Sequence, residues 1–150
     1  MAEAPQRIRL VEFGMGGETF ALAVDVVTDI IFPPEVTPEP AAPNTLLGLF
    51  NLRGVVTALI EVSELFNLTR QPRGSASRVL VLKPEQGAGF ALLVDYVSDI
   101  NQLGVDELFA TPSELPHPEL VVGIYNRGGG PVSVLDAVEL TRLEVFAPYR

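Results

Sequence analysis

An internal repeat constrains the fold of this chain more than any other feature. The segment FALAVDVVTDI at residues 20–30 recurs as FALLVDYVSDI at residues 90–100, and eight of the eleven positions are identical. A second block at residues 43–65 recurs 75 positions later, at residues 118–140, with matching proline, glycine and asparagine positions. Each copy is too short to bury a large core alone, so we expect the two halves to pack on each other within one domain, residues 1–150.

Both copies show the same order of expected elements, and most of these are strands. Short apolar segments rich in Val and Ile and bounded by Gly or Pro are typical of strands, whereas proline-rich segments run as surface loops because proline cannot donate to a sheet. The expected elements are strands at 8–13, 55–60 and 78–82, turns at 13–18 and 84–89, loops at 33–43 and 111–118, a connector at 70–77, and helices only at 61–67 and 136–145. The pattern predicts an all-β, barrel-like fold with repeats at about 8–69 and 78–145, and exchange of strands between the repeats stays open.

Composition excludes several classes of function. The 150 residues are 47% hydrophobic, which is enough for a core, yet no apolar run is long enough for a membrane helix. The absence of cysteine excludes disulfides, zinc knuckles, iron–sulfur clusters and thiol catalysis. A net charge of -9 argues against nucleic acid as a partner, because phosphate binding needs clustered Lys and Arg. We expect a cytoplasmic protein without direct membrane insertion.

Candidate motifs for catalysis or metal binding are weak. Two glycine-rich segments lack the Lys-Ser or Lys-Thr of a phosphate loop, so hairpin turns are the better interpretation. His117 is the single histidine and lies between two prolines, which offers no set of metal ligands. Asp25 and Asp29, with their copies Asp95 and Asp99, do not have the alternating oxygen ligands of a calcium loop, and a structural role is favoured. The sequence predicts no catalytic residue, no metal and no cofactor.

Arg53 is the most informative charged residue, because it interrupts an otherwise uncharged stretch from residue 46 to residue 60. A charge next to buried strands must pair with a carboxylate or face an edge of the sheet, and the pattern offers Asp29 or Glu61. The second copy allows two registers, which align Arg53 either with Arg127 or with Gly128. If Gly128 is the counterpart, only the first half keeps the pair, and that half would carry a special surface. An ion pair that only orients two strands is the alternative.

The segment ETFALAVDVVTDI, followed by LLGLFNLRGVV, resembles the CheW-like family of bacterial chemotaxis coupling proteins. The resemblance extends from about residue 9 to residue 145, and the Asn-Leu-Arg-Gly motif at residues 51–54 is its most specific part. Two positions depart from the family pattern, since Ala58 replaces a usual proline and Glu61 a usual aspartate.

The resemblance implies two pseudo-symmetric, SH3-like five-stranded β-barrel subdomains around a shared hydrophobic seam, with a short helix after each repeat. It also implies a non-catalytic adaptor that couples the cytoplasmic tip of a methyl-accepting chemoreceptor to the regulatory domain of a CheA-type histidine kinase, recruited to membrane receptor arrays. We expect a groove between the two barrels, walled by residues 27–31 and 52–56, and an ion pair between Asp29 and Arg53. The expected receptor- or kinase-binding residues are Val27, Asp29, Ile31, Asn51, Leu52, Arg53, Gly54 and Val55.

Other functions remain open at this stage. The same fold could serve a pilus or surface-motility pathway, which the sequence cannot separate from flagellar chemotaxis. A small ligand-binding or nucleic-acid-binding β-barrel is a further alternative, although the aromatic residues lie within apolar strands and are not interleaved with basic ones. An enzyme is the weakest alternative, because no nucleophile–base arrangement is present.

Overall fold

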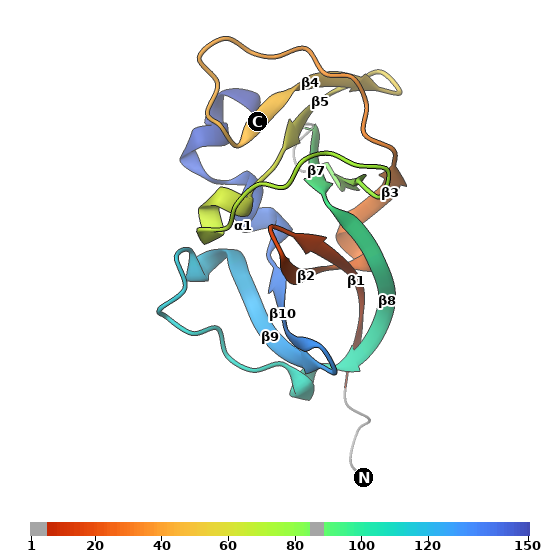
Figure 1. Cartoon of the computed structure of the whole chain (residues 1–150), viewed down its shortest axis with the longest axis vertical. Coiled ribbons are helices and arrows are strands. Elements are labelled where there is room, and N and C mark those ends of the chain that lie inside the picture. Colours follow the sequence, from red (N-terminus) through yellow and green to blue (C-terminus); the bar gives the residue numbers. More distant parts are fainter. Residues whose placement is uncertain (1–5, 85–88) are drawn as a thin grey trace.

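Two five-stranded sheets form the computed structural model, which describes residues 6–84 and 89–150 (Figure 1). The strands of one sheet, here sheet A, follow the order β8-β1-β2-β10-β9, and those of sheet B the order β3-β6-β7-β5-β4. The expected all-β fold with two five-stranded halves is confirmed. The strands are β1 (Arg7–Met15), β2 (Glu18–Ala23), β3 (Val27–Ile31), β4 (Leu46–Leu52), β5 (Val55–Ile60), β6 (Arg78–Leu82), β7 (Gly89–Val94), β8 (Tyr96–Gly104), β9 (Val121–Arg127) and β10 (Gly130–Leu135).

Each sheet contains strands from both repeats. Sheet A joins β1 and β2 of the first repeat to β8, β9 and β10 of the second, and sheet B has the reciprocal composition. Parallel pairs β2–β10 and β5–β7 connect the two contributions within each sheet, while the remaining neighbours are antiparallel. Replacing each strand of sheet A by its repeat counterpart gives the strand order of sheet B, so the two sheets are related by the sequence repeat.

Both sheets have a β-bulge at the equivalent place of a strand ladder, and this explains why a hydroxyl residue recurs there in both repeats. The β3–β6 ladder skips Thr28, and the β8–β1 ladder skips Ser98 at the equivalent place. Both hydroxyls donate to a backbone carbonyl of the neighbouring strand, Thr28 to Val81 at 3.4 Å and Ser98 to Glu12 at 3.3 Å. A β-bulge leaves one residue outside the ladder, and these hydroxyls satisfy carbonyls beside it.

The sequence prediction of the helices is partly wrong. The first predicted helix is a 3₁₀ turn, η2 (Ser63–Phe66), and the second divides into α1 (Ala137–Thr141) and the 3₁₀ helix η5 (Glu144–Tyr149). Three further 3₁₀ helices were missed: η1 (Val24–Val26), η3 (Val105–Glu107) and η4 (Pro118–Leu120). The valines of η1 resemble a continuing strand, but at this point the chain leaves sheet A for sheet B, so one ladder must end before the next begins.

The turns and loops follow the expectations where they are described. The turn expected at 13–18 is shorter than predicted, because β1 extends to Met15 and β2 begins at Glu18. Gly16 and Gly17 form the turn, and both have positive φ, as hairpin turns require. The turn expected at 84–89 lies partly outside the described residues. The proline-rich loop runs along the edge of sheet B, where Thr37 pairs with Leu49 of β4.

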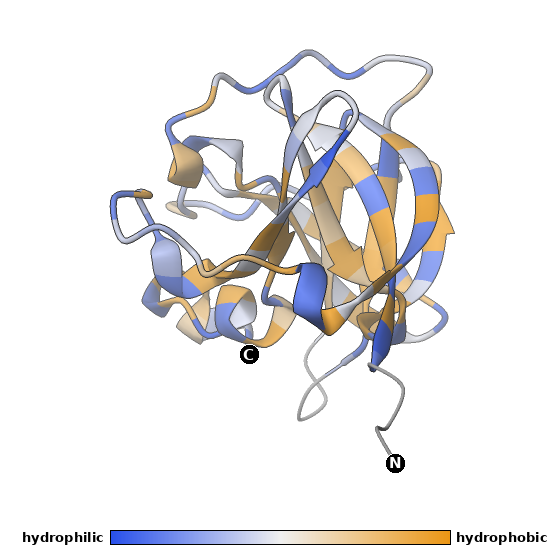
Figure 2. Cartoon of the chain, turned by 90° about the horizontal axis from the view of Figure 1, so that it is seen from below, coloured by the Kyte–Doolittle hydropathy of each residue, from blue (hydrophilic) through white to orange (hydrophobic). Residues whose placement is uncertain are grey.

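Three hydrophobic clusters form the core of the molecule. The largest lies between them and includes Phe13 and Phe20 of sheet A, Leu80 and Phe90 of sheet B, and Phe146 of η5. Each sheet also has a smaller core of its own. Figure 2 shows hydrophobic residues concentrated on the strands in the interior. Burial of one such side chain contributes about 1.5–3 kcal/mol, so the shared cluster stabilises the packing of the two sheets on each other.

Candidate protein-docking surface

The structure brings Arg53 and Asp29 together. Arg53 is the first residue of the two-residue turn between β4 and β5, and it has φ +51°, followed by Gly54 at +87°. Positive φ at both positions matches the twist of a hairpin, and the Asn51 side chain accepts a hydrogen bond from the Gly54 N–H at 2.9 Å. The Arg53 Nη2 contacts Asp29 Oδ2 of β3, with side-chain exposures of 69% and 33%.

This ion pair joins opposite ends of the strand order of sheet B. Asp29 belongs to β3, at one end of the order, and Arg53 to the turn that follows β4, at the other. An exposed pair contributes only about 0–1 kcal/mol to stability, so its main effect is on the shape of this end of the sheet. The other predicted partner, Glu61, is buried and binds Arg70 at 2.8 Å instead.

Exposed apolar side chains lie next to the pair in sequence. Ile30 and Phe32 follow Asp29, and Val55 and Val56 follow the turn; they are 43%, 73%, 40% and 64% exposed. We call these four residues the β3–β5 patch. The Arg78 guanidinium lies 4.4 Å from the centre of the Phe32 ring, which is a cation–π contact. Exposed apolar side chains in two segments that an ion pair joins are candidates for contact with a partner protein.

The predicted binding residues divide into two groups. Asp29 is half-buried, and Asn51, Arg53, Gly54 and Val55 are exposed at this end of the sheet. The remaining three are partly buried against the cores: Val27 against the cluster between the sheets, and Ile31 and Leu52 against the cluster within sheet B. The sequence analysis missed Ile30, Phe32 and Val56, although strand alternation beside the half-buried Ile31 could have indicated the exposure of Ile30.

The groove expected between two barrels is not formed by the predicted residues. Both segments, 27–31 and 52–56, belong to sheet B, and the Asp29–Arg53 pair connects them. The prediction is wrong because both segments come from the first repeat and fold into the same sheet, so they do not face each other across the space between the two sheets.

The second half has an ion pair as well, which corrects the expectation of asymmetry. The pairing of Phe50 with Thr57 and of Tyr125 with Val132 fixes an offset of 75, so Gly128 does align with Arg53. However, Arg127 supplies the charge from the preceding position, and its Nη2 lies 3.3 Å from Asp99 Oδ2.

This second pair has a buried extension. Arg127 Nη1 also lies 3.5 Å from a carboxylate oxygen of Glu12, which is 3% exposed, and the Tyr125 hydroxyl donates to the other oxygen of Glu12. Burial raises the pKa of Tyr125, and its hydrogen bond to the Glu12 carboxylate and the charge of that group raise it further. The other half has Val81 and Phe50 at these positions, so the buried network is specific to sheet A.

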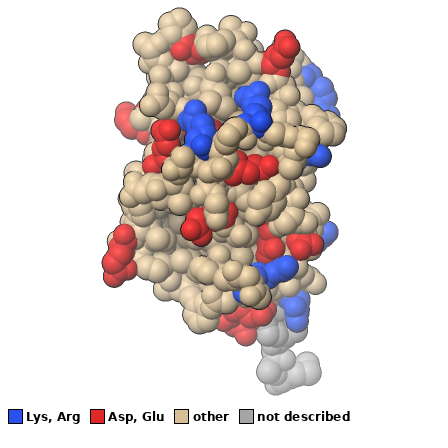
Figure 3. All heavy atoms as spheres, viewed as in Figure 1, with Lys and Arg blue, Asp and Glu red and all other residues tan. Residues whose placement is uncertain are grey.

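The remaining candidates have structural contacts. Asp95 accepts a hydrogen bond from the Gly16 N–H at 2.9 Å, and partial burial is the main reason that its pKa is raised. His117 contacts Glu119 at 3.0 Å, and this hydrogen bond lowers the pKa of the exposed Glu119. Within residues 6–84 and 89–150, no group of three or more His, Cys, Asp or Glu side chains could hold a metal ion. On the face shown in Figure 3, basic side chains are interspersed with acidic ones.

The fold has two repeat-related sheets, exposed apolar side chains and ion pairs at the equivalent positions of both sheets. These features are typical of a module that binds other proteins. A profile of the CheW-like domain matches residues 9–145, and the chain belongs to this family. It is 30% identical over 139 residues to the chemotaxis protein CheW of Helicobacter pylori, covering 90% of this chain and 82% of that protein. It is 23% identical to CheW of Treponema pallidum, covering 93% and 85%.

The fold also matches a solved structure. The scaffolding protein TtCheW from Thermoanaerobacter tengcongensis superimposes with a TM-score of 0.84 at 19% identity, covering 97% of this chain and 94% of that one. In the part of the chain that the structure describes, no helix is both long and apolar enough to cross a membrane.

Proposed function

We propose that this chain is a non-catalytic adaptor in chemotaxis signalling, which couples chemoreceptor tips to a CheA-type histidine kinase. Membership of the CheW-like family over residues 9–145 is the observation that carries the proposal, together with relatives that are named chemotaxis proteins. An adaptor acts by holding two partners at once, which raises the effective concentration of one near the other. It works in the cytoplasm at the receptor arrays.

The β3–β5 patch, which comes from the two segments that the Asp29–Arg53 pair joins, binds the regulatory domain of the kinase. The patch presents apolar side chains at the end of a sheet, and such side chains supply most of the affinity when a partner desolvates them. The ion pair holds the β4–β5 turn against β3, so that both segments of the surface are positioned before the partner arrives. The net charge of -9 opposes self-association and favours a partner with complementary charge.

A binding experiment with the kinase regulatory domain tests the surface. Val56→Asp places a charge in the patch at a side chain that is 64% exposed, so the fold should tolerate it. We expect the dissociation constant for the kinase domain to rise at least about tenfold, measured by isothermal titration calorimetry. Val145→Asp, at a residue 46% exposed on η5, is the matched control and should leave the constant unchanged. Equal effects of the two substitutions, or none, would remove the patch from the interface.

A further inference from the structure

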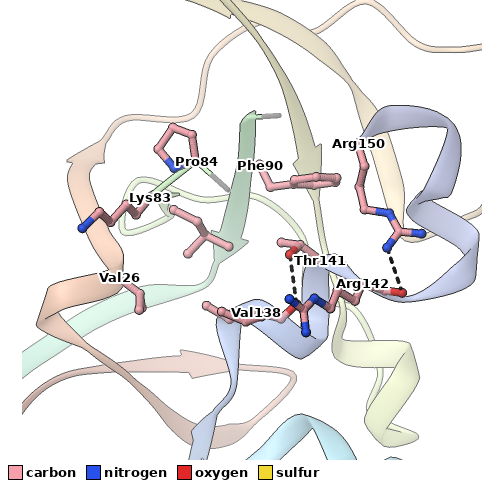
Figure 4. Close-up of a pocket in the computed structure, with 10 residues that line it drawn as sticks. Val26, Lys83, Pro84, Phe90, Val138, Thr141, Arg142 and Arg150 are labelled. Carbon is pink, nitrogen blue, oxygen red and sulfur yellow. Dashed lines mark hydrogen bonds between the residues drawn. The ribbon is translucent and has the colours of Figure 1, made fainter. Parts of the chain in front are cut away.

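A pocket of about 540 Å³ opens between sheet B and α1 (Figure 4). Its apolar wall includes residues from three elements, and basic side chains stand at its rim on both sides. The residues that matter here are Val26, Phe90 and Val138 in the wall, and Lys83, Arg142 and Arg150 at the rim. None of the positions considered for the docking surface lines this pocket, so it is a separate feature of the molecule.

The other half of the molecule fills the corresponding space with an aromatic ring. The repeat relates Phe90 to Phe20, and the block that aligns Leu140 with Leu65 places Thr141 where the first half has Phe66. The rings of Phe20 and Phe66 lie 5.3 Å apart, whereas the side chain of Thr141 bonds back to the Val138 carbonyl at 3.1 Å. Phe90 contacts a ring from another position, Phe146, at 5.6 Å, but Phe146 does not line the pocket. The pocket lies beside Thr141, at the position where the first half has Phe66.

A second difference between the two halves places a basic side chain at the pocket. In sheet A, Tyr96 pairs with Gly14, and its ring covers the glycine so closely that an added Cβ would lie 2.2 Å from it. In sheet B, Val26 takes the place of Tyr96 and Lys83 the place of Gly14; the Lys83 N–H donates to the Val26 carbonyl at 2.7 Å. This half thus has a smaller apolar side chain and a basic one at the edge of the pocket.

Three of the ten basic residues of an acidic chain line this one pocket. Arg142 lies 3.7 Å from Glu139, which offsets part of its charge, and Arg150 donates to the Arg142 carbonyl at 3.4 Å. Within residues 6–84 and 89–150, neither Lys83 nor Arg150 forms an ion pair. The rim therefore attracts an anion, while the wall accepts an apolar group.

We infer that this pocket binds a small aromatic anion. Its ring occupies the space that the Phe66 ring fills in the other half, beside Phe90 and Val138, and its carboxylate or sulfonate lies at the basic rim. The volume falls within the range of about 300–1,000 Å³ typical of small-molecule sites, and the mixture of an apolar wall with a few charged groups is typical of them as well. The site is independent of the adaptor function proposed above.

The test uses indole-3-acetate as the probe and indole-3-acetamide as its neutral counterpart, followed by ¹H–¹⁵N NMR. We expect a dissociation constant of about 1 mM for the acid, at the ligand efficiency usual for small ligands. Shifts should be confined to amides of the lining segments, which are η1, β6 with Lys83, β7, α1 with Arg142, and Arg150. Indole-3-acetamide should bind at least about fivefold more weakly. Thr141→Phe should abolish binding by placing a ring in the pocket, as Phe66 stands at this position in the first half, while Thr69→Phe, at an exposed site in the other half, should not.

Exposed charges provide a test that does not depend on repacking. The double variant Lys83→Gln/Arg150→Gln should reduce the affinity for the acid to that for the amide, and Arg7→Gln/Arg9→Gln, on exposed residues of β1, should leave it unchanged. Equal binding of acid and amide to the parent protein, shifts spread over other elements, or no binding at 10 mM would each overturn the inference. Retention of the kinase domain should be the same in all four variants, which separates this test from that of the adaptor function.

Discussion

The buried pair Glu12 and Tyr125 of sheet A can be replaced by the apolar residues that sheet B has at the same positions. This replacement tests whether an apolar pair stabilises sheet A as well as the polar pair does. The pair Glu12 and Tyr125 corresponds to Val81 and Phe50, which are apolar. Glu12→Val alone leaves the Tyr125 hydroxyl, on a residue 5% exposed, without its acceptor, and Tyr125→Phe alone leaves a buried carboxylate with one partner fewer. Each single change should destabilise the fold, whereas both together should restore a complete apolar contact.

The structure sets the magnitudes. Glu12→Val leaves the buried Tyr125 hydroxyl without a partner, which should cost about 1–3 kcal/mol of the free energy of unfolding. Tyr125→Phe leaves Glu12 with Arg127 at 3.5 Å but removes a hydrogen bond to a charged group, which should cost about 1.5–3 kcal/mol. The double variant should lose only about 0–1 kcal/mol, because Arg127 retains Asp99 at 3.3 Å. The middle of these ranges gives a coupling energy of about 3–4 kcal/mol, which exceeds the error expected for independent sites.

Urea unfolding followed by circular dichroism measures these differences, and melting temperatures should fall by about 2–4 °C per kcal/mol for a chain of this size. Glu18→Val, at an exposed glutamate of β2, controls for the loss of one negative charge and should change stability by less than about 0.5 kcal/mol. Additive losses in the double variant, with no recovery, would refute the argument that the network replaces an apolar pair.

Two further predictions concern contacts in sheet A. Because burial raises the pKa of Asp95, the folded state binds its proton more tightly than the unfolded one; this residue therefore favours folding below pH 3.8, and the benefit is lost as pH rises through the folded pKa. Asp95→Asn, which keeps an acceptor for the Gly16 N–H, should raise the melting temperature relative to the parent at pH 7 but not at pH 3, and a constant difference would contradict this. Gly14→Ala should destabilise the parent, since its Cβ would meet the Tyr96 ring at 2.2 Å, and should cost less in a Tyr96→Val background, which urea unfolding can measure; equal costs would exclude the steric explanation.

The repeat predicted much of the fold. Segments 55–60 and 78–82 are strands with the predicted bounds, because apolar runs between glycine and proline carry a strong local signal. Which strands join to form each sheet was not predictable from such local signals. The parallel pairs β2–β10 and β5–β7 join segments that are distant in the chain, and nothing local specifies which partner a strand edge selects.

The candidate site shows the same division. The motif at residues 51–54 identified Arg53, and pattern alone narrowed its partner to two residues, of which the structure brings Asp29 into contact. The ion pair of Arg127 was not predictable from the alignment of the two repeats. Arg127 lies one position before Gly128, the counterpart of Arg53, and its long side chain still reaches Asp99, the counterpart of Asp29. The pocket beside α1 was also missed, since it is lined by residues from distant segments of the chain, among them Val26, Phe90 and Thr141, which no local pattern brings together.

Simultaneous binding of both partners is the property on which the adaptor function depends. Sedimentation velocity of this chain with a soluble chemoreceptor tip fragment and the kinase regulatory domain measures it directly. A single faster species that contains all three components, and is absent from each binary mixture, is the expected result. Displacement of the receptor fragment by the kinase domain would contradict the proposed coupling.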